Sequence, residues 1–321
     1  MPRFIVLVRL VLVALAVLGS GAFAQSYPNK PVRLVVPFPP GGSADVVARS
    51  VAQAMGQGLG QPVVVENKAG ADGIIASEAV MKSPPDGYTL LLATNTAFNA
   101  APILHKVVPY HPVADFTPVG KVGNFGFFIF VNDATPARNL AQLLDYARAN
   151  PGKLTYGSGN STSIIATARL AQQAKVNLVH VPYKGDAPMT LDLLAGRVNM
   201  AIATGTLLPH VREGKLRVLA TLLPQRAASM PEVPTLPEAG AEQIPMTPWA
   251  GIFGPAKMPR EIVDRLAGAL TRALAQPEVR SQLESVAFQP QGSSADELAA
   301  LLRDQLEIWA KAGKEAGIAA Q

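Results

Sequence analysis

The chain has 321 residues, of which 49% are hydrophobic and 16% charged, so it is long enough to bury two hydrophobic cores. Its formal charge of +5 is mild, only 6% of its residues are aromatic, and Lys and Arg form no blocks, which argues against a nucleic-acid-binding protein. Cysteine is absent, which excludes disulfide bonds, thiolate metal sites and a cysteine nucleophile.

The first 24 residues have the pattern of a secretory signal peptide. Arg3 and Arg9 precede an apolar run at 10–18, and Ala22-Phe23-Ala24 fits a small-x-small cleavage site. The alternative is a membrane anchor, but the apolar run is shorter than the ~20 residues that a bilayer-spanning helix needs. We therefore expect export and cleavage near Ala24.

Strands and helices alternate in the first part of the expected mature chain. The continuous apolar run at 32–38 is typical of a strand that is covered on both faces. A Pro/Gly-rich turn and a helix follow, because Val47, Val51 and Met55 form one apolar stripe. Next we expect a strand at 62–66, a helix at 74–81 and a strand at 88–94. This β-α-β-α-β order predicts a parallel, right-handed α/β sheet.

The alternation begins again at Phe125. Residues 125–132 form a strongly apolar strand, and a helix at 140–149 ends before Pro151-Gly152. We expect further strands at 154–158, 177–183, 198–204 and 216–221, and further helices at 164–174 and 191–194. These elements predict a second α/β unit.

The last part of the chain predicts a return to the first unit. A strand is expected at 249–255 and two helices at 260–275 and 294–312, the second opened by a capping box from Ser294 to Glu297. We therefore expect two parallel-sheet lobes joined by two crossing segments, near 125–131 and 247–254. Lobe 1 would comprise 25–124 and 247–321, and lobe 2 would comprise 125–246.

Ligands of open α/β sheets bind beyond the carboxyl ends of the strands, and five loops of this chain are expected there, at 39–43, 94–99, 158–163, 183–185 and 204–206. These loops are rich in hydroxyls, amides and backbone N–H groups, and the first turn of a helix binds anions. Each loop taken singly is also consistent with a tight turn and a helix cap. The predicted ligand-binding residues are Pro40, Gly41, Gly42, Ser43, Thr94, Asn95, Thr96, Asn99, Ser158, Gly159, Asn160, Ser161, Thr162, Tyr183 and Thr204.

Motifs for catalysis are missing. The stretch PFPPGGSAD lacks the Gly-Lys-Ser/Thr of a P-loop, and YGSGNSTS contains neither G-x-S-x-G nor a complete G-x-G-x-x-G. The four histidines lack metal-ligand spacing, and His180 lies in an apolar strand, where we expect a structural role. We therefore expect no catalytic residue, metal or cofactor. An exported hydrolase that uses Ser158 or Ser161 remains an alternative, because a catalytic triad is assembled in space.

Several motifs in fixed order carry a family resemblance. They are YPNKPVRLVVPFPPGGSADVVAR, VVVENKAGADGIIASEAV, SPPDGYTLLLATNTAFN, LTYGSGNSTS, LVHVPYKGDAPMTLDLLAGRV and PREIVDRLAGAL. Together they resemble the substrate-binding proteins of the tripartite tricarboxylate transporters, the Bug family. The resemblance covers essentially all of the expected mature chain.

This resemblance implies a monomeric periplasmic protein with a two-lobed, type II periplasmic-binding-protein fold. Such a protein would hold a small carboxylate in a flytrap-like cleft through the loops at 40–43, 94–96 with Asn99, and 158–162, and deliver it to the membrane subunits of the transporter. A ligand-sensing subunit of a membrane signalling system is a further alternative.

The chain departs from the family pattern at two places. Residues 164–166 replace a common Ser/Thr-x-His-Leu, and Thr204-Gly205-Thr206 stands where relatives often carry Asp or Asn. Both places would contact the distal end of a ligand, so the resemblance leaves the identity of the carboxylate open.

Overall fold

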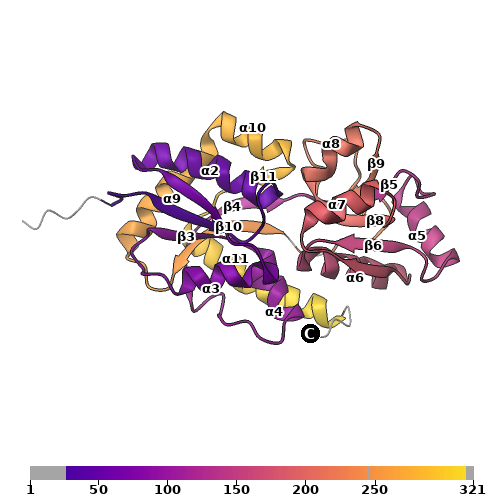
Figure 1. The fold of residues 1–321 in the computed structure, drawn as a ribbon, viewed down its shortest axis with the longest axis horizontal. Coiled ribbons are helices and arrows are strands. Elements are labelled where there is room, and N and C mark those ends of the chain that lie inside the picture. The colour runs from indigo at the N-terminus through magenta and orange to yellow at the C-terminus, as the bar shows by residue number, and fades with distance from the viewer. Residues whose placement is uncertain (1–26, 245, 247, 316–321) are drawn as a thin grey trace, which may run out of the picture.

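The computed structural model describes residues 27–244, 246 and 248–315, so the predicted signal peptide lies outside the described residues. The chain forms two lobes, each built on one β-sheet with helices packed around it (Figure 1). Within the described ranges, every helix is too short or too polar to cross a bilayer.

The first lobe contains a six-stranded sheet with the strand order β11-β4-β10-β3-β1-β2. Its strands are β1 (Val32–Val36), β2 (Val63–Asn67), β3 (Thr89–Thr94), β4 (Phe116–Phe125), β10 (Trp249–Pro255) and β11 (Phe288–Pro290). The surrounding helices include α2 (Ser43–Leu59), α3 (Ile74–Met81), α4 (Ala101–Leu104), α9 (Arg260–Ala275), α10 (Pro277–Ser285) and α11 (Ala295–Glu315). A short π-helical segment, η2 (Thr96–Ala100), follows β3, and a 3-10 turn, η1 (Ala71–Gly73), precedes α3.

The second lobe contains a five-stranded sheet with the strand order β7-β6-β8-β5-β9. Its strands are β5 (Phe127–Asn132), β6 (Thr155–Ser158), β7 (Val179–Pro182), β8 (Met200–Thr204) and β9 (Leu216–Thr221). Its helical elements are α5 (Leu140–Ala149), α6 (Ser161–Ala174), α7 (Asp186–Leu194), η3 (Gly205–Leu207) and α8 (Leu208–Arg212).

Both sheets are mixed, which corrects the prediction of two parallel sheets. The predicted parallel pairs are present, since β1 pairs in parallel with β2 and β3, and β6 pairs in parallel with β7 and β8. The strands that cross between the lobes are antiparallel to their neighbours: β10 to β3 and β4, and β5 to β8 and β9. A crossing strand enters its sheet from the cleft, where β3 and β8 end, so it must run in the opposite direction.

Some elements of the first lobe were not expected from the sequence. They include the strand β4, the helix α10 and the short strand β11. The first crossing lies at Gly126, between β4 and β5, because β4 ends at Phe125 and β5 begins at Phe127.

The capping box of α11 is confirmed: the Glu297 side chain accepts the Ser294 N–H at 2.8 Å, and Ser294 Oγ accepts the Glu297 N–H at 3.2 Å.

Glycine at the first crossing permits a close backbone approach. Gly126 N–H donates to Ala287 O at 2.9 Å, and a Cβ at Gly126 would lie only 2.5 Å from that oxygen. Gly123 pairs with Pro290 of β11, and a Cβ there would clash with the Gln289 carbonyl oxygen. The segment before and within β11 therefore packs directly on the crossing from the first lobe to the second.

Candidate functional site

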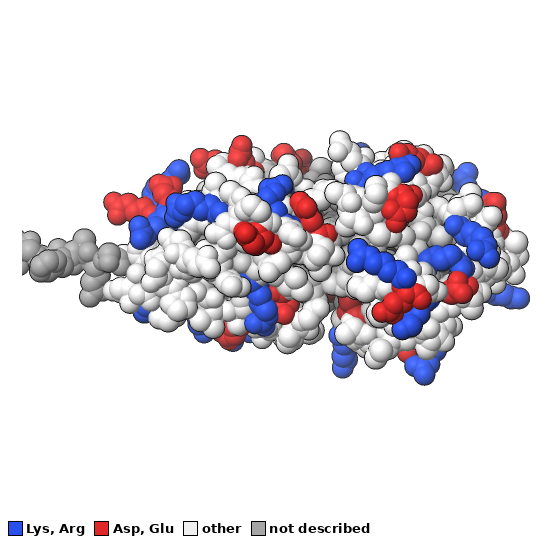
Figure 2. All heavy atoms as spheres, turned by 90° about the horizontal axis from the view of Figure 1, so that it is seen from above, with Lys and Arg blue, Asp and Glu red and all other residues white. Residues whose placement is uncertain are grey.

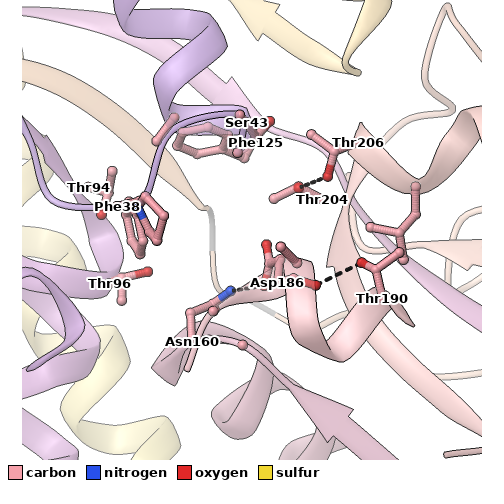
Figure 3. Close-up of a pocket in the computed structure, with 18 of the residues that line it drawn as sticks. Phe38, Ser43, Thr94, Thr96, Phe125, Asn160, Asp186, Thr190, Thr204 and Thr206 are labelled. Atoms are coloured by element: carbon pink, nitrogen blue, oxygen red, sulfur yellow. Dashed lines mark hydrogen bonds between the residues drawn. The ribbon is translucent and has the colours of Figure 1, made fainter. Parts of the chain in front are cut away.

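A cavity of about 610 Å³ lies between the lobes, beyond the carboxyl ends of β1, β3 and β8 (Figure 3). The predicted site residues that line it are Pro40, Gly41, Gly42, Ser43, Thr94, Asn95, Thr96, Gly159, Asn160 and Thr204. The parallel order of the strands explains this clustering, because the ends of parallel neighbours meet at one edge of a sheet. A direct contact between these residues and a ligand remains a prediction.

Five predicted site residues are outside the cavity lining: Asn99, Ser158, Ser161, Thr162 and Tyr183. Asn99 Nδ2 and Ser161 Oγ are buried without a hydrogen-bond partner, whereas other polar groups of these residues contact the protein. Asn99 Oδ1 accepts a hydrogen bond from Trp249 Nε1 at 3.1 Å, and the Tyr183 hydroxyl donates to Asp192 at 2.8 Å. The backbone N–H of Ser161 donates to Asp72 Oδ1 of the first lobe at 3.1 Å.

The loop before α2 is held by Asp45. This carboxylate accepts hydrogen bonds from Gly41 N–H at 3.0 Å, from Arg49 at 2.9 Å and from Asn67 Nδ2 at 2.9 Å. Burial opposes the ionisation of Asp45, but these three bonds outweigh it and hold its pKa below the ordinary value. Asp45 is therefore charged, and its oxygens are occupied by neighbouring protein groups, which agrees with the helix-stabilising role that its position in the first turn suggests.

Two buried hydroxyls line the cavity without any hydrogen-bond partner. Ser43 Oγ, at the start of α2, belongs to a residue that is 5% exposed, and Thr94 Oγ1, at the end of β3, to one that is 2% exposed. Figure 3 shows both residues at the cavity wall that the first lobe contributes. Buried polar atoms are nearly always hydrogen-bonded, so these two hydroxyls are candidates to bind a group inside the cavity.

Hydroxyl and amide groups join the lobes beside the cavity. Thr162 Oγ1 lies 2.8 Å from Thr96 Oγ1 and accepts a hydrogen bond from Asn95 Nδ2, also at 2.8 Å. All three side chains are buried, and we refer to them as the interlobe cluster. In this structure Thr162 contacts the opposite lobe, and its contact with a ligand stays a prediction.

The loop that follows β7 was expected at the cleft, at 183–185, but the start of α7 was not. Lys184, Gly185, Asp186, Ala187, Pro188 and Thr190 of this loop and of α7 all line the cavity. Asp186 Oδ1 accepts a hydrogen bond from Asn160 Nδ2 at 3.2 Å, and burial raises the pKa of Asp186 to about 6, although the Asn160 bond acts in the opposite direction. Asp186 was not predicted as a site residue, although it directly follows this predicted loop, and that position was the available signal.

Aromatic side chains form the apolar part of the wall. Phe38 follows β1, while Phe125 and Phe127 flank the first crossing, and all three line the cavity. They were not predicted as site residues, because apolar residues near a strand end are indistinguishable from core residues in a sequence.

The two serines that would serve a hydrolase, Ser158 and Ser161, are both buried and lie outside the cavity lining. Ser158 Oγ lies 2.6 Å from His180 Nε2, and the His180 ring stacks on Tyr156 with a centroid separation of 4.8 Å. Burial lowers the pKa of His180. No carboxylate among the described residues hydrogen-bonds to His180, and Ser158 is 2% exposed, so this pair gives the hydrolase alternative no support.

The described residues also give no support for a metal site, and the face in Figure 2 gives none for a nucleic-acid-binding surface. The described part of the chain contains no cluster of three His, Asp or Glu side chains arranged to hold a metal ion. On the face drawn in Figure 2, basic and acidic side chains are interspersed, so this face carries no extended positive surface.

A sequence model described as the tripartite tricarboxylate transporter family receptor matches residues 47–318. A protein of Pseudomonas sp. (strain P51), described as a UPF0065 protein in the tcbD-tcbE intergenic region, is 39% identical over 93% of this chain and 91% of its own. Protein BugT of Bordetella pertussis is 33% identical over 96% of this chain and 95% of its own.

Solved structures show the same architecture. Rpa4515 of R. palustris with adipate has a TM-score of 0.88 at 32% identity and covers 92% of this chain and 100% of its own. MatC of Rhodopseudomonas palustris with bound malate has a TM-score of 0.83 at 30% identity, over 89% of this chain and 100% of its own. The periplasmic binding protein BugD has a TM-score of 0.85 at 33% identity, over 92% of this chain and 100% of its own. These similarities confirm the two-lobed periplasmic-binding-protein fold that the sequence predicted.

Proposed function

Because the chain belongs to the tripartite tricarboxylate transporter receptor family, we propose that it captures a small organic carboxylate in the interlobe cavity and delivers it to the membrane subunits of such a transporter. The adipate and malate in two similar structures are both small carboxylates, which supports this ligand class. The resemblance noted in the sequence is thereby confirmed at the level of the family.

The pair of unpartnered hydroxyls is the observation that carries the proposal. A carboxylate that leaves water must receive several hydrogen bonds, and Ser43 Oγ and Thr94 Oγ1 are free to donate them. Ser43 is also the first residue of α2, a helix of 17 residues whose N-terminal N–H groups and dipole favour an anion.

The rest of the lining suits a carrier that must release its ligand. Lys184 is the single Lys or Arg among the described residues that line the cavity, and its side chain is exposed. Neutral donors therefore provide most of the contacts. Such contacts bind an anion without the strong bidentate pairing that an arginine would form.

A ligand screen with paired compounds tests the proposal. We expect organic acids to raise the thermal unfolding temperature of the protein, and the amides of the same acids to leave it unchanged. In calorimetry, Ser43→Ala and Thr94→Val should each weaken binding by at least about tenfold, since a hydrogen bond to a charged group contributes about 1.5–3 kcal/mol. Thr271→Val, at an exposed position of α9, is the matched control. Equal binding of acids and amides would contradict the proposal, as would turnover of a bound acid.

We also propose how the protein is processed and organised. The signal peptide is cleaved near Ala24, and the mature protein acts in the periplasm as a monomer without catalytic activity. Lobe 1 comprises 25–124 and 247–321, and lobe 2 comprises 125–246, a division that the two sheets support. N-terminal sequencing of exported protein and sedimentation of the purified protein test these points. Co-purification with a transporter rather than a sensor kinase distinguishes delivery from signalling.

A further inference from the structure

One carboxylate faces the cavity from the second lobe. Asp186, the first residue of α7, is the single Asp or Glu among the described residues that line the cavity. Figure 3 shows Asp186 and Asn160 on the opposite side of the cavity from Ser43 and Phe125. The acidic group and the free hydroxyls therefore lie on different walls of one space.

Asp186 lacks a cationic partner within the protein. Its Oδ1 accepts the hydrogen bond from Asn160, and no described Lys, Arg or His forms an ion pair with it. Lys184, which lies two residues earlier and also lines the cavity, is exposed and does not reach it. A carboxylate that is partly withdrawn from water and unpaired destabilises the protein, and its raised pKa reflects this cost.

Part of the cavity wall is apolar. Phe38, Phe125 and Phe127 lie in the cavity lining together with Ser43 and Asp186. The cavity thus offers, in one space, hydroxyl donors for an anion, an apolar surface and a carboxylate acceptor. A ligand complementary to all three carries a carboxylate, an apolar part and a hydrogen-bond donor.

We propose that Asp186 binds a cationic nitrogen of the ligand, so that the preferred ligands are carboxylates with an amino group at the end remote from Ser43 and Thr94. This inference rests on the proposed function and names the class of ligand for the same cavity. An ammonium group supplies the missing counter-charge of Asp186, whereas a second carboxylate would place two negative charges together.

Calorimetry with matched acids tests the inference. Two series are compared at a pH well above the pKa of Asp186: caproate, adipate and ε-aminocaproate, and butyrate, succinate and γ-aminobutyrate. In at least one series the amino acid should bind at least about tenfold more tightly than the other two acids, as expected for a charge-assisted hydrogen bond. Asp186→Asn should abolish this preference. Asp145→Asn, at an exposed position of α5, should retain it.

The outcomes separate this inference from the proposed function. If an unsubstituted acid or a dicarboxylate binds best in both series, or if Asp186→Asn keeps the preference for the amino acid, the role of Asp186 is wrong and carboxylate binding stands. If none of the acids binds, the proposed function fails and this inference fails with it. The preference is measured on the wild-type protein, so the test does not depend on how well the variant folds.

Discussion

The hydroxyl oxygens of Thr96 and Thr162 lie 2.8 Å apart and connect the first lobe to the second. Thr96 begins η2 and Thr162 lies in the first turn of α6, so one hydrogen bond ties together the helical segments that follow β3 and β6. Asn95 Nδ2 donates to the same Thr162 oxygen. The cluster therefore stabilises only the arrangement in which the lobes are close, which is the arrangement that a ligand touching both lobes requires.

Replacing Thr162 by Val should weaken ligand binding by favouring the open arrangement. Valine keeps the volume but removes the hydroxyl, which leaves the buried Asn95 amide and Thr96 hydroxyl without this partner in the closed form. A lost partner costs about 1–3 kcal/mol, so we expect roughly tenfold weaker binding or more in calorimetry. Small-angle scattering of the free variant should show a larger radius of gyration. Unchanged affinity and an unchanged radius, equal to those of Thr271→Val, would contradict this role.

Adding a methyl group at Gly159 should disrupt the cavity. A Cβ at this position would lie 2.5 Å from the Asp186 backbone nitrogen and 2.5 Å from the Gly185 carbonyl carbon. Because backbone atoms cannot move aside cheaply, Gly159→Ala should displace the loop before α7, weaken binding more than tenfold and lower the unfolding temperature. Gly268→Ala in α9 is the control, since its Cβ would meet only the end of the Arg272 side chain at 3.4 Å. Wild-type binding in Gly159→Ala would show that the loop adapts.

Replacing Asp186 by Asn should stabilise the free protein at neutral pH. The pKa of Asp186 rises from 3.8 to about 6 on folding, so the folded state binds more protons than the unfolded state between these values. Stability is therefore lost as the pH rises through this window, and the Asn variant escapes the loss. Asn160 and the exposed Lys184 are the neighbouring polar and charged groups in the cavity lining. The gain should be on the order of 2 kcal/mol above the window.

Thermal unfolding at pH values below and above this window measures the effect. The two proteins should unfold at similar temperatures at the acidic pH, and the variant at a higher temperature at the neutral pH. A difference in unfolding temperature between the two proteins that does not change with pH would contradict the raised pKa of Asp186.

Ligand binding should change the fluorescence of Trp249. This side chain is fully buried, and its Nε1 donates to Asn99 of η2, the segment whose Thr96 contacts the opposite lobe. A change in the interlobe cluster should therefore alter the surroundings of the indole. Trp309 is also buried but bonds to Gln305 within α11, so it should give a constant background. The saturable change should persist in Trp309→Phe, and its absence at full ligand saturation would argue for a rigid cavity.

Local patterns in the sequence were sufficient to predict the helices whose apolar residues recur with a clear period. The helices at Ile74–Met81, Leu140–Ala149 and Arg260–Ala275 have the predicted bounds, because their apolar spacing and end signals lie within the helices themselves. The sequence also located ten residues of the cavity lining, such as Ser43 and Thr94, since every parallel strand of an α/β unit ends at the same edge of its sheet.

The tertiary structure determined the features that depend on partners distant in the chain. The strand β4 contains Pro118 and two glycines, so its pattern is not that of a strand, and it forms through pairing with β10 more than a hundred residues later. Thr162 has the same local setting as a ligand-binding hydroxyl, but Asn95 and Thr96 occupy it from the opposite lobe. Asp186 faces the cavity because the loop before α7 packs on Gly159. Local sequence specifies which groups stand at the strand ends, whereas the packing of the two lobes determines which of those groups are left without a partner and are free to bind a ligand.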